Sequence, residues 1–269
     1  MSIAAVEPTV RTRRTGAIAS IVLDRPTRMN AMNDQVLAEL LAAIEAATSD
    51  SMVRVITLTG AGRAFCAGGD MIGFNDGALV EPVPFETQVR GLRTNMRIVS
   101  LLRDCDAVTI AAVNGACAGA GLSLALACDL RISSTRAIYR TAFLDAGLSG
   151  DFGGTWLLAR LIGESRARRM YLLNEKIDAA TAAEWGLASQ LLDVEEFEAG
   201  YQLIASTIAA KAPVALANIK KNFVDAARLD FATACDNEAV RHISCSRTED
   251  AAEAATAFVE KRAAVFTGA

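Results

Sequence analysis

An uncharged and mostly apolar run from Ala107 to Cys128 limits most strongly what this chain can fold into. Its length would suit a transmembrane helix. An Asn-Gly pair at 114–115 interrupts the run, and two further glycines weaken a continuous helix. The same residues fit a buried strand over 108–113, a glycine loop and a buried helix over 120–127. We therefore favour a strand–loop–helix unit inside a globular protein over a membrane segment.

The composition supports this choice. The chain has 269 residues, 52% hydrophobic and 22% charged, so it can bury a large core and is not generally disordered. Its net charge of −4 argues against a nucleic-acid-binding surface. The six cysteines form no Cys-x-x-Cys pair and His242 is the single histidine, so we expect no metal site. Unpaired cysteines in small, apolar surroundings and the lack of an apolar leader indicate a soluble, cytoplasmic protein.

The hydrophobic periodicity predicts the order of strands and helices along the chain. We expect strands at 10–12, 17–23, 53–59, 108–113, 130–133 and 188–192. We expect one helix that begins after Asn33, with Asn33 as its N-cap, and further helices at 87–102, at 120–127 and around 156–161. The stretch 73–84 reads as a loop. Beyond about residue 164 the pattern is mainly helical. We therefore predict an α/β core over 1–195 and a C-terminal helical region over 196–269.

Two loops of small residues follow predicted strands, Cys66–Asp70 and Asn114–Gly121. Small residues let a ligand approach the backbone closely. Free N–H groups at the start of the helix after Gly119 would point at such a ligand. One donor from each loop could hold a carbonyl oxygen that becomes an oxyanion. The alternative is that these glycines only permit tight packing between helix and sheet.

Other catalytic motifs are incomplete. Gly60-Ala-Gly62 follows a strand as a dinucleotide loop does, but Phe65 stands where the third glycine belongs. No phosphate-binding Gly-x4-Gly-Lys sequence occurs. Ser149 lies outside a nucleophile-elbow motif, and a single histidine gives little support to a serine or cysteine triad.

Several motifs, in order and spacing, resemble the crotonase (enoyl-CoA hydratase/isomerase) family over about residues 8–267. They are Leu23–Met32, Gly60–Met71, Ala111–Gly121 with Cys128-Asp129, Gly147-Leu148, Gly153–Thr155, Ala183–Leu187 and Phe258–Arg262. The resemblance implies an α/β fold, a crotonase-like spiral of ββα turns with a C-terminal helical trimerisation region. It also implies acyl-CoA substrates and a homo-trimer or dimer of trimers, without metal or redox cofactor.

By the same resemblance, the backbone N–H groups of Gly69 and Ala120 form the oxyanion hole. The residues that would hold coenzyme A are Arg28, Met29, Ala31, Ala67, Asp70 and Met71, with Phe258 and Lys261 reaching the nucleotide end, three residues apart on one helix face.

The chain departs from the family where hydratases carry two glutamates. These positions fall on Ser123 and Phe143. Neither side chain replaces a carboxylate as proton carrier, so hydration by the two-glutamate route is in doubt. We expect Phe143 to line the acyl site instead.

Asp151 supplies another carboxylate. Its surroundings, Gly147–Leu158, are similar to epoxyphenylacetyl-CoA isomerases and Δ3,Δ2-enoyl-CoA isomerases, and the resemblance makes Asp151 the catalytic acid/base. Apolar neighbours such as Phe143 should raise its pKa. The structural alternative is that Asp151 caps a helix starting near Phe152. Asp145 is a second nearby acid, for which we expect a structural role.

We therefore predict an enzyme that shifts a double bond in an unsaturated acyl-CoA. The alternatives are an enoyl-CoA hydratase that relies on Asp151, and a catalytically silent acyl-CoA-binding protein. Dehalogenation is disfavoured because His242 lies far from the position a dehalogenase needs, and a Clp-like peptidase because 118–121 contains no serine.

Overall fold

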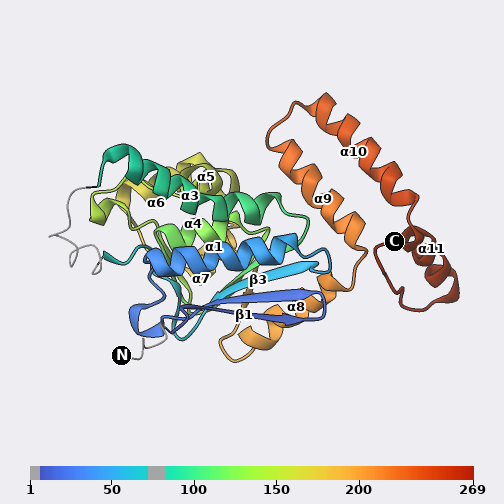
Figure 1. Cartoon of the computed structure of the whole chain (residues 1–269), viewed down its shortest axis with the longest axis horizontal. Coiled ribbons are helices and arrows are strands. Elements are labelled where there is room, and N and C mark those ends of the chain that lie inside the picture. The colour runs from blue at the N-terminus through green and yellow to red at the C-terminus, as the bar shows by residue number, and fades with distance from the viewer. Residues whose placement is uncertain (1–6, 72–82) are drawn as a thin grey trace, which may run out of the picture.

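The structure is a computed structural model that describes residues 7–71 and 83–269. The loop predicted at 73–84 therefore lies, up to residue 82, outside the described residues. Figure 1 shows an α/β core from which the last helices of the chain extend to one side.

Two sheets form the core. The larger has the order β1 (Val10–Thr15), β2 (Ile18–Leu23), β3 (Val55–Gly60), β5 (Val108–Val113), β7 (Leu130–Ser134) and β10 (Gln190–Leu192). The smaller has the order β4 (Ala64–Cys66), β6 (Ala116–Ala118), β8 (Ile138–Arg140) and β9 (Ile177–Asp178). The pairs β1–β2 and β8–β9 are antiparallel, and the other neighbours are parallel.

Helices complete each turn of the chain. They are α1 (Asp34–Ser49), α3 (Phe85–Asp104), α4 (Ala120–Ala127), α5 (Gly154–Ile162), α6 (Glu164–Leu173), α7 (Ala179–Glu184), α8 (Phe197–Ala209), α9 (Pro213–Ala226), α10 (Phe231–Ser246) and α11 (Glu249–Glu260). Short 3-10 turns occupy Pro26–Arg28 and Leu144–Ala146. Three successive turns give one strand to each sheet and then a helix: β3–β4–α3, β5–β6–α4 and β7–β8–α5. This is the predicted spiral of ββα turns.

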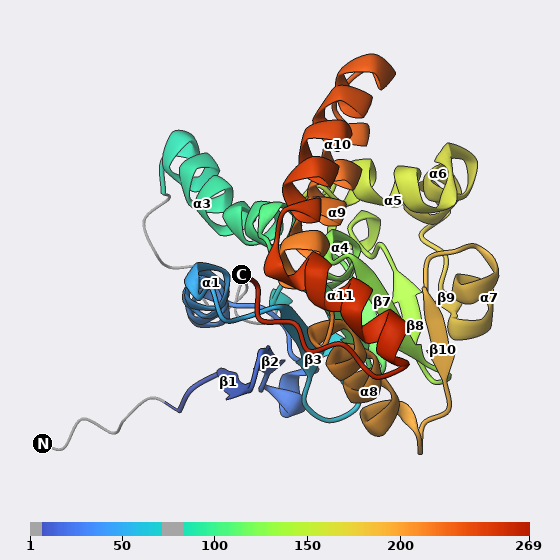
Figure 2. The ribbon, with the colours of Figure 1, turned by 90° about the vertical axis from the view of Figure 1, so that its right-hand side faces the viewer.

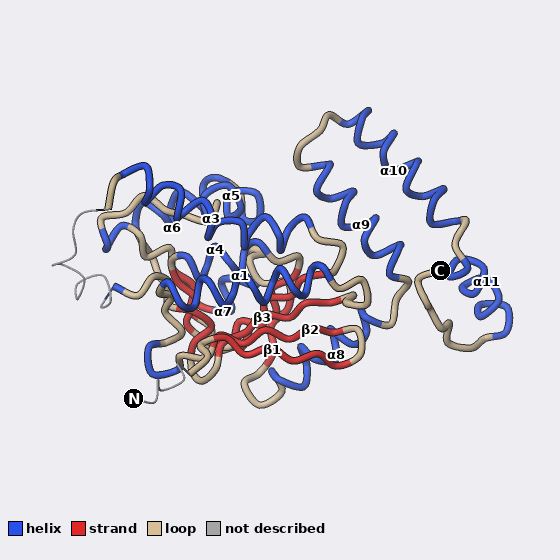
Figure 3. Tube along the Cα trace, viewed as in Figure 1, coloured by secondary structure: helices blue, strands red, loops and turns tan. Residues whose placement is uncertain are grey.

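The larger sheet is covered on both faces, with α1, α3 and α4 on one side and α8 on the other (Figure 3). Successive side chains of a strand point to opposite faces of the sheet, so each buried strand residue can be assigned to one face. Val55 and Ile110 pack in the cluster with Phe197 of α8, whereas Ile56 and Ala111 belong to the cluster on the other face.

The uncharged run folds as predicted, into a strand and a helix rather than a single span. It forms β5, β6 and α4, and every residue of α4 is buried. Among the described residues, no single helix has the length and hydropathy of a membrane span, and α8 with α9 passes such a test only as a sharply bent pair.

Most predicted elements lie within a few residues of the observed ones, and the N-cap at Asn33 is confirmed, since its side chain accepts from the Val36 N–H. The strands β4, β6, β8 and β9 were not predicted. They have two or three residues each, too few for an alternating pattern to emerge.

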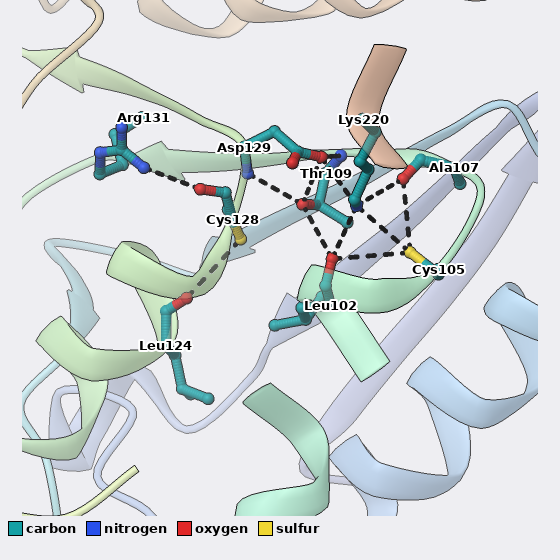
Figure 4. A network of polar contacts seen from close by, with 9 residues as sticks. All are labelled: Leu102, Cys105, Ala107, Thr109, Leu124, Cys128, Asp129, Arg131 and Lys220. Carbon is teal, nitrogen blue, oxygen red and sulfur yellow. Dashed lines mark hydrogen bonds and ion pairs between the residues drawn. The ribbon is translucent and has the colours of Figure 1, made fainter. Parts of the chain in front are cut away.

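The C-terminal helices α9–α11 form an arm that projects from the core (Figures 1 and 2). Lys220 of α9 anchors it (Figure 4). The Lys220 ammonium is buried, pairs with the Asp129 carboxylate at 2.8 Å, and donates to the carbonyls of Leu102 and Ala107 at 2.8 Å each. The helix α8 precedes this arm and packs on the sheet. The division at residue 195 stays a prediction.

Candidate active site

The two small-residue loops lie against each other because β4 and β6 are parallel neighbours, so their carboxyl ends meet. A Cβ on Gly68, whose φ is +100°, would lie 3.1 Å from the Ala118 carbonyl oxygen. A Cβ on Gly121 would lie 2.6 Å from the Cβ of Cys66. These glycines therefore do permit tight packing. Gly69 differs, because it is exposed and a Cβ there would meet nothing within 4 Å.

Each loop contributes one backbone N–H group that has no backbone acceptor among the described residues, and the role of the two groups as an oxyanion hole stays a prediction. Ala120 is the first residue of α4, so its N–H has no acceptor within the helix. Around Gly69, the Met32 N–H donates to Gly68 O and the Asp70 N–H donates to Met32 O. In the described part of the chain, the backbone hydrogen bonds outside helices leave the N–H groups of Gly69 and Ala120 unused.

The segment expected to hold coenzyme A lies alongside the first loop. The Ala67 N–H donates to Met29 O at 3.0 Å, and Met29 and Asn30 both adopt left-handed φ values, 51° and 57°. The Asn30 amide fixes this turn by donating to the carbonyls of Ala61 and Ala64. The fold thus brings together, from two parts of the chain, the residues that are predicted to bind coenzyme A.

Those residues are not equally accessible. Arg28 and Met71 are exposed, whereas Ala31 is buried. Asp70 is buried as well, and its carboxylate pairs with Arg25 at 2.9 Å. Arg25, which the sequence analysis did not single out, therefore ties the two segments together. The ligand-binding roles stay predictions.

Asp151 lies in a loop with unusual backbone geometry. Gly150 and Gly153 have φ values of 119° and 71°, and Phe152 is held at 48°, a region that costs energy for a residue with a side chain. The Asp151 carbonyl accepts from the Gly154 N–H at 3.0 Å and from the Ser123 hydroxyl at 3.2 Å. The loop is therefore fixed against the first turn of α4.

The Asp151 carboxyl group is partly buried, and burial changes its acidity. Its Oδ1 is buried and has no hydrogen-bond partner among the described residues. Burial raises its pKa from 3.8 to about 6, in the direction expected from its apolar neighbours. Near neutral pH the group can therefore both take up and release a proton.

The capping role considered for Asp151 is wrong. The helix α5 begins at Gly154 with Gly153 as its N-cap, and no side chain donates or accepts at that cap. The Asp151 carboxyl is thus free of a local structural hydrogen bond.

Two aromatic rings stand beside this loop. Phe143 is buried and stacks parallel to Tyr171 of α6, with ring centroids 6.2 Å apart. A Cβ on Gly150 would lie 3.5 Å from the Tyr171 ring and 3.9 Å from the Phe143 ring. Phe143 was predicted to line the site. Tyr171 was missed, because a single tyrosine inside a helical pattern carries no sequence signal.

The remaining predicted residues lie elsewhere. Asp145 is exposed and pairs with Arg140 at 2.8 Å, in agreement with a structural role. Phe258 is exposed on α11, but that helix ends at Glu260, and Lys261 follows with a left-handed φ of 56°. The prediction that Phe258 and Lys261 share a helix face is therefore wrong, because the chain turns at Lys261. Their contact with coenzyme A stays a prediction.

The chain belongs to the enoyl-CoA hydratase/isomerase family. The family profile matches residues 13–269. The fold is the crotonase fold, and the protein is an acyl-CoA enzyme of this family.

Individual relatives carry different activities. The chain is 38% identical over 260 residues to a probable enoyl-CoA hydratase from Rhodobacter capsulatus, covering 97% of this chain and 98% of the relative. It is 35% identical to 1,2-epoxyphenylacetyl-CoA isomerase from Escherichia coli, covering 93% and 95%. A putative enoyl-CoA hydratase from Thermobifida fusca, solved in complex with CoA, superposes with a TM-score of 0.81 at 33% identity, covering 88% and 92%.

Proposed function

We propose that this enzyme shifts a double bond within an unsaturated acyl-CoA, with Asp151 as the single acid/base. One observation carries the proposal. The Asp151 carboxyl group has a pKa of about 6, and its buried Oδ1 has no hydrogen-bond partner among the described residues. By the family resemblance, Ser123 and Phe143 fall at the two positions where hydratases carry glutamates. A single carboxyl group is sufficient for a 1,3-proton shift, because it can act first as base and then as acid.

The reaction begins with the thioester carbonyl oxygen between the N–H groups of Gly69 and Ala120. Hydrogen bonds to that oxygen stabilise the negative charge that develops when a proton leaves the acyl chain. The Asp151 carboxylate takes the proton from one carbon, which leaves a conjugated dienolate. The carboxylic acid then returns the proton two carbons away, so the double bond moves and no atom is gained or lost.

The comparisons support the substrate class. A relative that is 35% identical is named an epoxyphenylacetyl-CoA isomerase, and a structural neighbour binds CoA. On this basis the exposed Arg28 and Met71 would contact the coenzyme, with the thioester between the two loops. We further propose a homo-trimer or dimer of trimers, in which Phe258 and Lys261 reach the nucleotide of a neighbouring subunit.

Hydration is the second candidate, and one feature favours it. Ser123 and Tyr171 both direct a hydroxyl at Gly154, where a Cβ would collide with both oxygens. Two hydroxyls close to Asp151 could position a water molecule for it to activate. The relative that is 38% identical is named a probable enoyl-CoA hydratase.

Asp151→Asn tests the proposal, with Asp145→Asn as a matched control for the same chemical change at an exposed position. We expect Asp151→Asn to lower turnover of 3-enoyl-CoA by about 10²–10⁴-fold, the usual cost of losing a positioned general base. Asp145→Asn should retain turnover. The parent enzyme is assayed in parallel with 2-enoyl-CoA. If the parent enzyme hydrates 2-enoyl-CoA rapidly and does not shift the double bond of 3-enoyl-CoA, hydration is the activity and the isomerase proposal is wrong. If Asp151→Asn keeps full activity, Asp151 is not the acid/base.

A further inference from the structure

Tyr171 is an unassigned residue that contacts the Asp151 loop at both ends. It lies on α6, and its ring passes 3.5 Å from the position that a Cβ on Gly150 would take. Its hydroxyl oxygen lies 2.5 Å from the corresponding position on Gly154. A Cβ at Gly154 would displace the Tyr171 hydroxyl, whereas at Gly150 the ring is at ordinary contact distance. The side chain therefore runs along the loop from the residue before Asp151 to the first residue of α5.

The ring of Tyr171 also forms part of an apolar wall. It is parallel to the ring of Phe143, with an interplanar angle of 1°. Phe143 is itself buried, as is Phe152, which follows Asp151. A wall of this kind limits the access of water to the carboxyl group, and exclusion of water disfavours the charged form of an acid.

The hydroxyl group of Tyr171 is available as a donor. Within residues 7–71 and 83–269 it takes part in no hydrogen bond. Burial and the negative charge of Asp151 raise the pKa of Tyr171 to about 12, so the hydroxyl keeps its proton at neutral pH and is close enough to respond to that charge. The Asp151 Oδ1 is an acceptor that also has no partner in this part of the chain.

We propose that Tyr171 is the positioning residue for Asp151: its ring shields the carboxyl group from water, and its hydroxyl donates a hydrogen bond when the carboxylate forms. This inference rests on the proposed role of Asp151 as acid/base. It goes beyond that role by assigning two opposing effects to one side chain. The ring favours the protonated acid, and the hydroxyl favours the carboxylate.

Two substitutions separate these effects. Tyr171→Phe keeps the ring and removes the donor, so the pKa of Asp151 should rise, by about half to one pH unit. Tyr171→Ala removes the wall, so water should solvate the carboxylate and the pKa should fall, by about one pH unit. A purely structural role would not move the pKa in opposite directions.

The pKa is measured in two ways. The first is the acidic limb of the pH dependence of kcat/KM for 3-enoyl-CoA, which reports the essential base of the free enzyme. The second needs no turnover: the stability difference between each protein and its Asp151→Asn counterpart is followed from pH 4 to 8 by urea denaturation. Tyr201→Phe is the control, because Tyr201 lies on α8 and its hydroxyl bonds to Glu198.

We expect an upward shift for Tyr171→Phe, a downward shift for Tyr171→Ala and none for Tyr201→Phe. No shift in either Tyr171 variant, or shifts in the same direction, would overturn the inference. Failure of the proposed function is distinguishable, because an active Asp151→Asn enzyme would remove the catalytic role while the denaturation experiment still reports the pKa of Asp151.

Discussion

At the scale of single residues, the pKa of Asp151 decides between a structural and a chemical role. A carboxyl group that accepted hydrogen bonds at a helix N-terminus would have a lowered pKa, as the N-cap Asp178 does through its bonds to Thr181. Asp151 has a raised pKa, and among residues 7–71 and 83–269 its buried Oδ1 has no hydrogen-bond partner. The fold therefore loses stability when this group ionises, which is a property typical of functional sites.

This cost predicts that Asp151→Asn stabilises the protein at neutral pH. Between pH 3.8 and about 6 the folded protein binds more protons at Asp151 than the unfolded chain, so the free energy of unfolding falls as pH rises. Asparagine does not titrate. The variant should therefore match the parent below pH 4 and exceed it by roughly 1–2 kcal/mol above pH 6, a value reduced for partial solvent screening. Urea denaturation across this range measures the difference. If the difference in free energy of unfolding between Asp151→Asn and the parent were the same at pH 5 and pH 8, a raised pKa of Asp151 would be contradicted.

At the scale of elements, the attachment of α9 includes an ion pair between the buried Lys220 ammonium and the partly buried Asp129 carboxylate. The Asp129 carboxylate accepts from the backbone N–H and the hydroxyl of Thr109, and pairs with Lys220 (Figure 4). Because Lys220 also satisfies the carbonyls of Leu102 and Ala107, its ammonium is fully engaged between α3, β5 and α9. This contact is one of those that join the arm to the core.

Lys220→Met should destabilise the protein by about 2–4 kcal/mol, because it leaves a partly buried carboxylate and two carbonyls without their donor. The adjacent Lys221 gives a matched control. It pairs with Asp106 at 2.7 Å, but both side chains are exposed, so Lys221→Met should cost less than about 1 kcal/mol. Denaturant midpoints of the two variants test this. Equal losses of stability in the two variants would show that the burial of Lys220 does not increase its contribution to stability.

At the scale of the whole molecule, the arm exposes apolar side chains that the core does not cover. Phe231, Phe258 and Val259 are 85%, 84% and 79% exposed. Exposed apolar surface of this kind usually marks an association site. Helices that project from a core in one direction, as in Figure 1, can bury such surface against the next copy of the same chain.

For the proposed homo-trimer or dimer of trimers, sedimentation at micromolar concentration should give the mass of three or six chains. Phe231→Asp would place a charge on the exposed apolar surface of α10. If this surface is buried between copies, the variant should shift the distribution toward smaller species, whereas Asp236→Asn on the same helix should leave the mass unchanged. A monomeric mass for the unmodified protein would contradict the assembly.

The sequence by itself determined the family, the alternation of strands and helices, and the two loops. These follow from local patterns, since apolar strands, glycine loops and the N-cap at Asn33 act over a few residues. It also singled out Asp151, because the segment Gly147–Leu158 resembles family isomerases that have an acid at this position. The direction of its pKa followed from its apolar neighbours.

Only the tertiary structure decided what surrounds that carboxylate. Tyr171 and Ser123 meet at Gly154 from two different helices, and Lys220 reaches Leu102 across more than a hundred residues of chain. No local pattern encodes these contacts, because they depend on how distant helices pack. The same reason explains why the three-residue strands β4 and β6 were missed, since they are stabilised by each other and by the glycines packed against them.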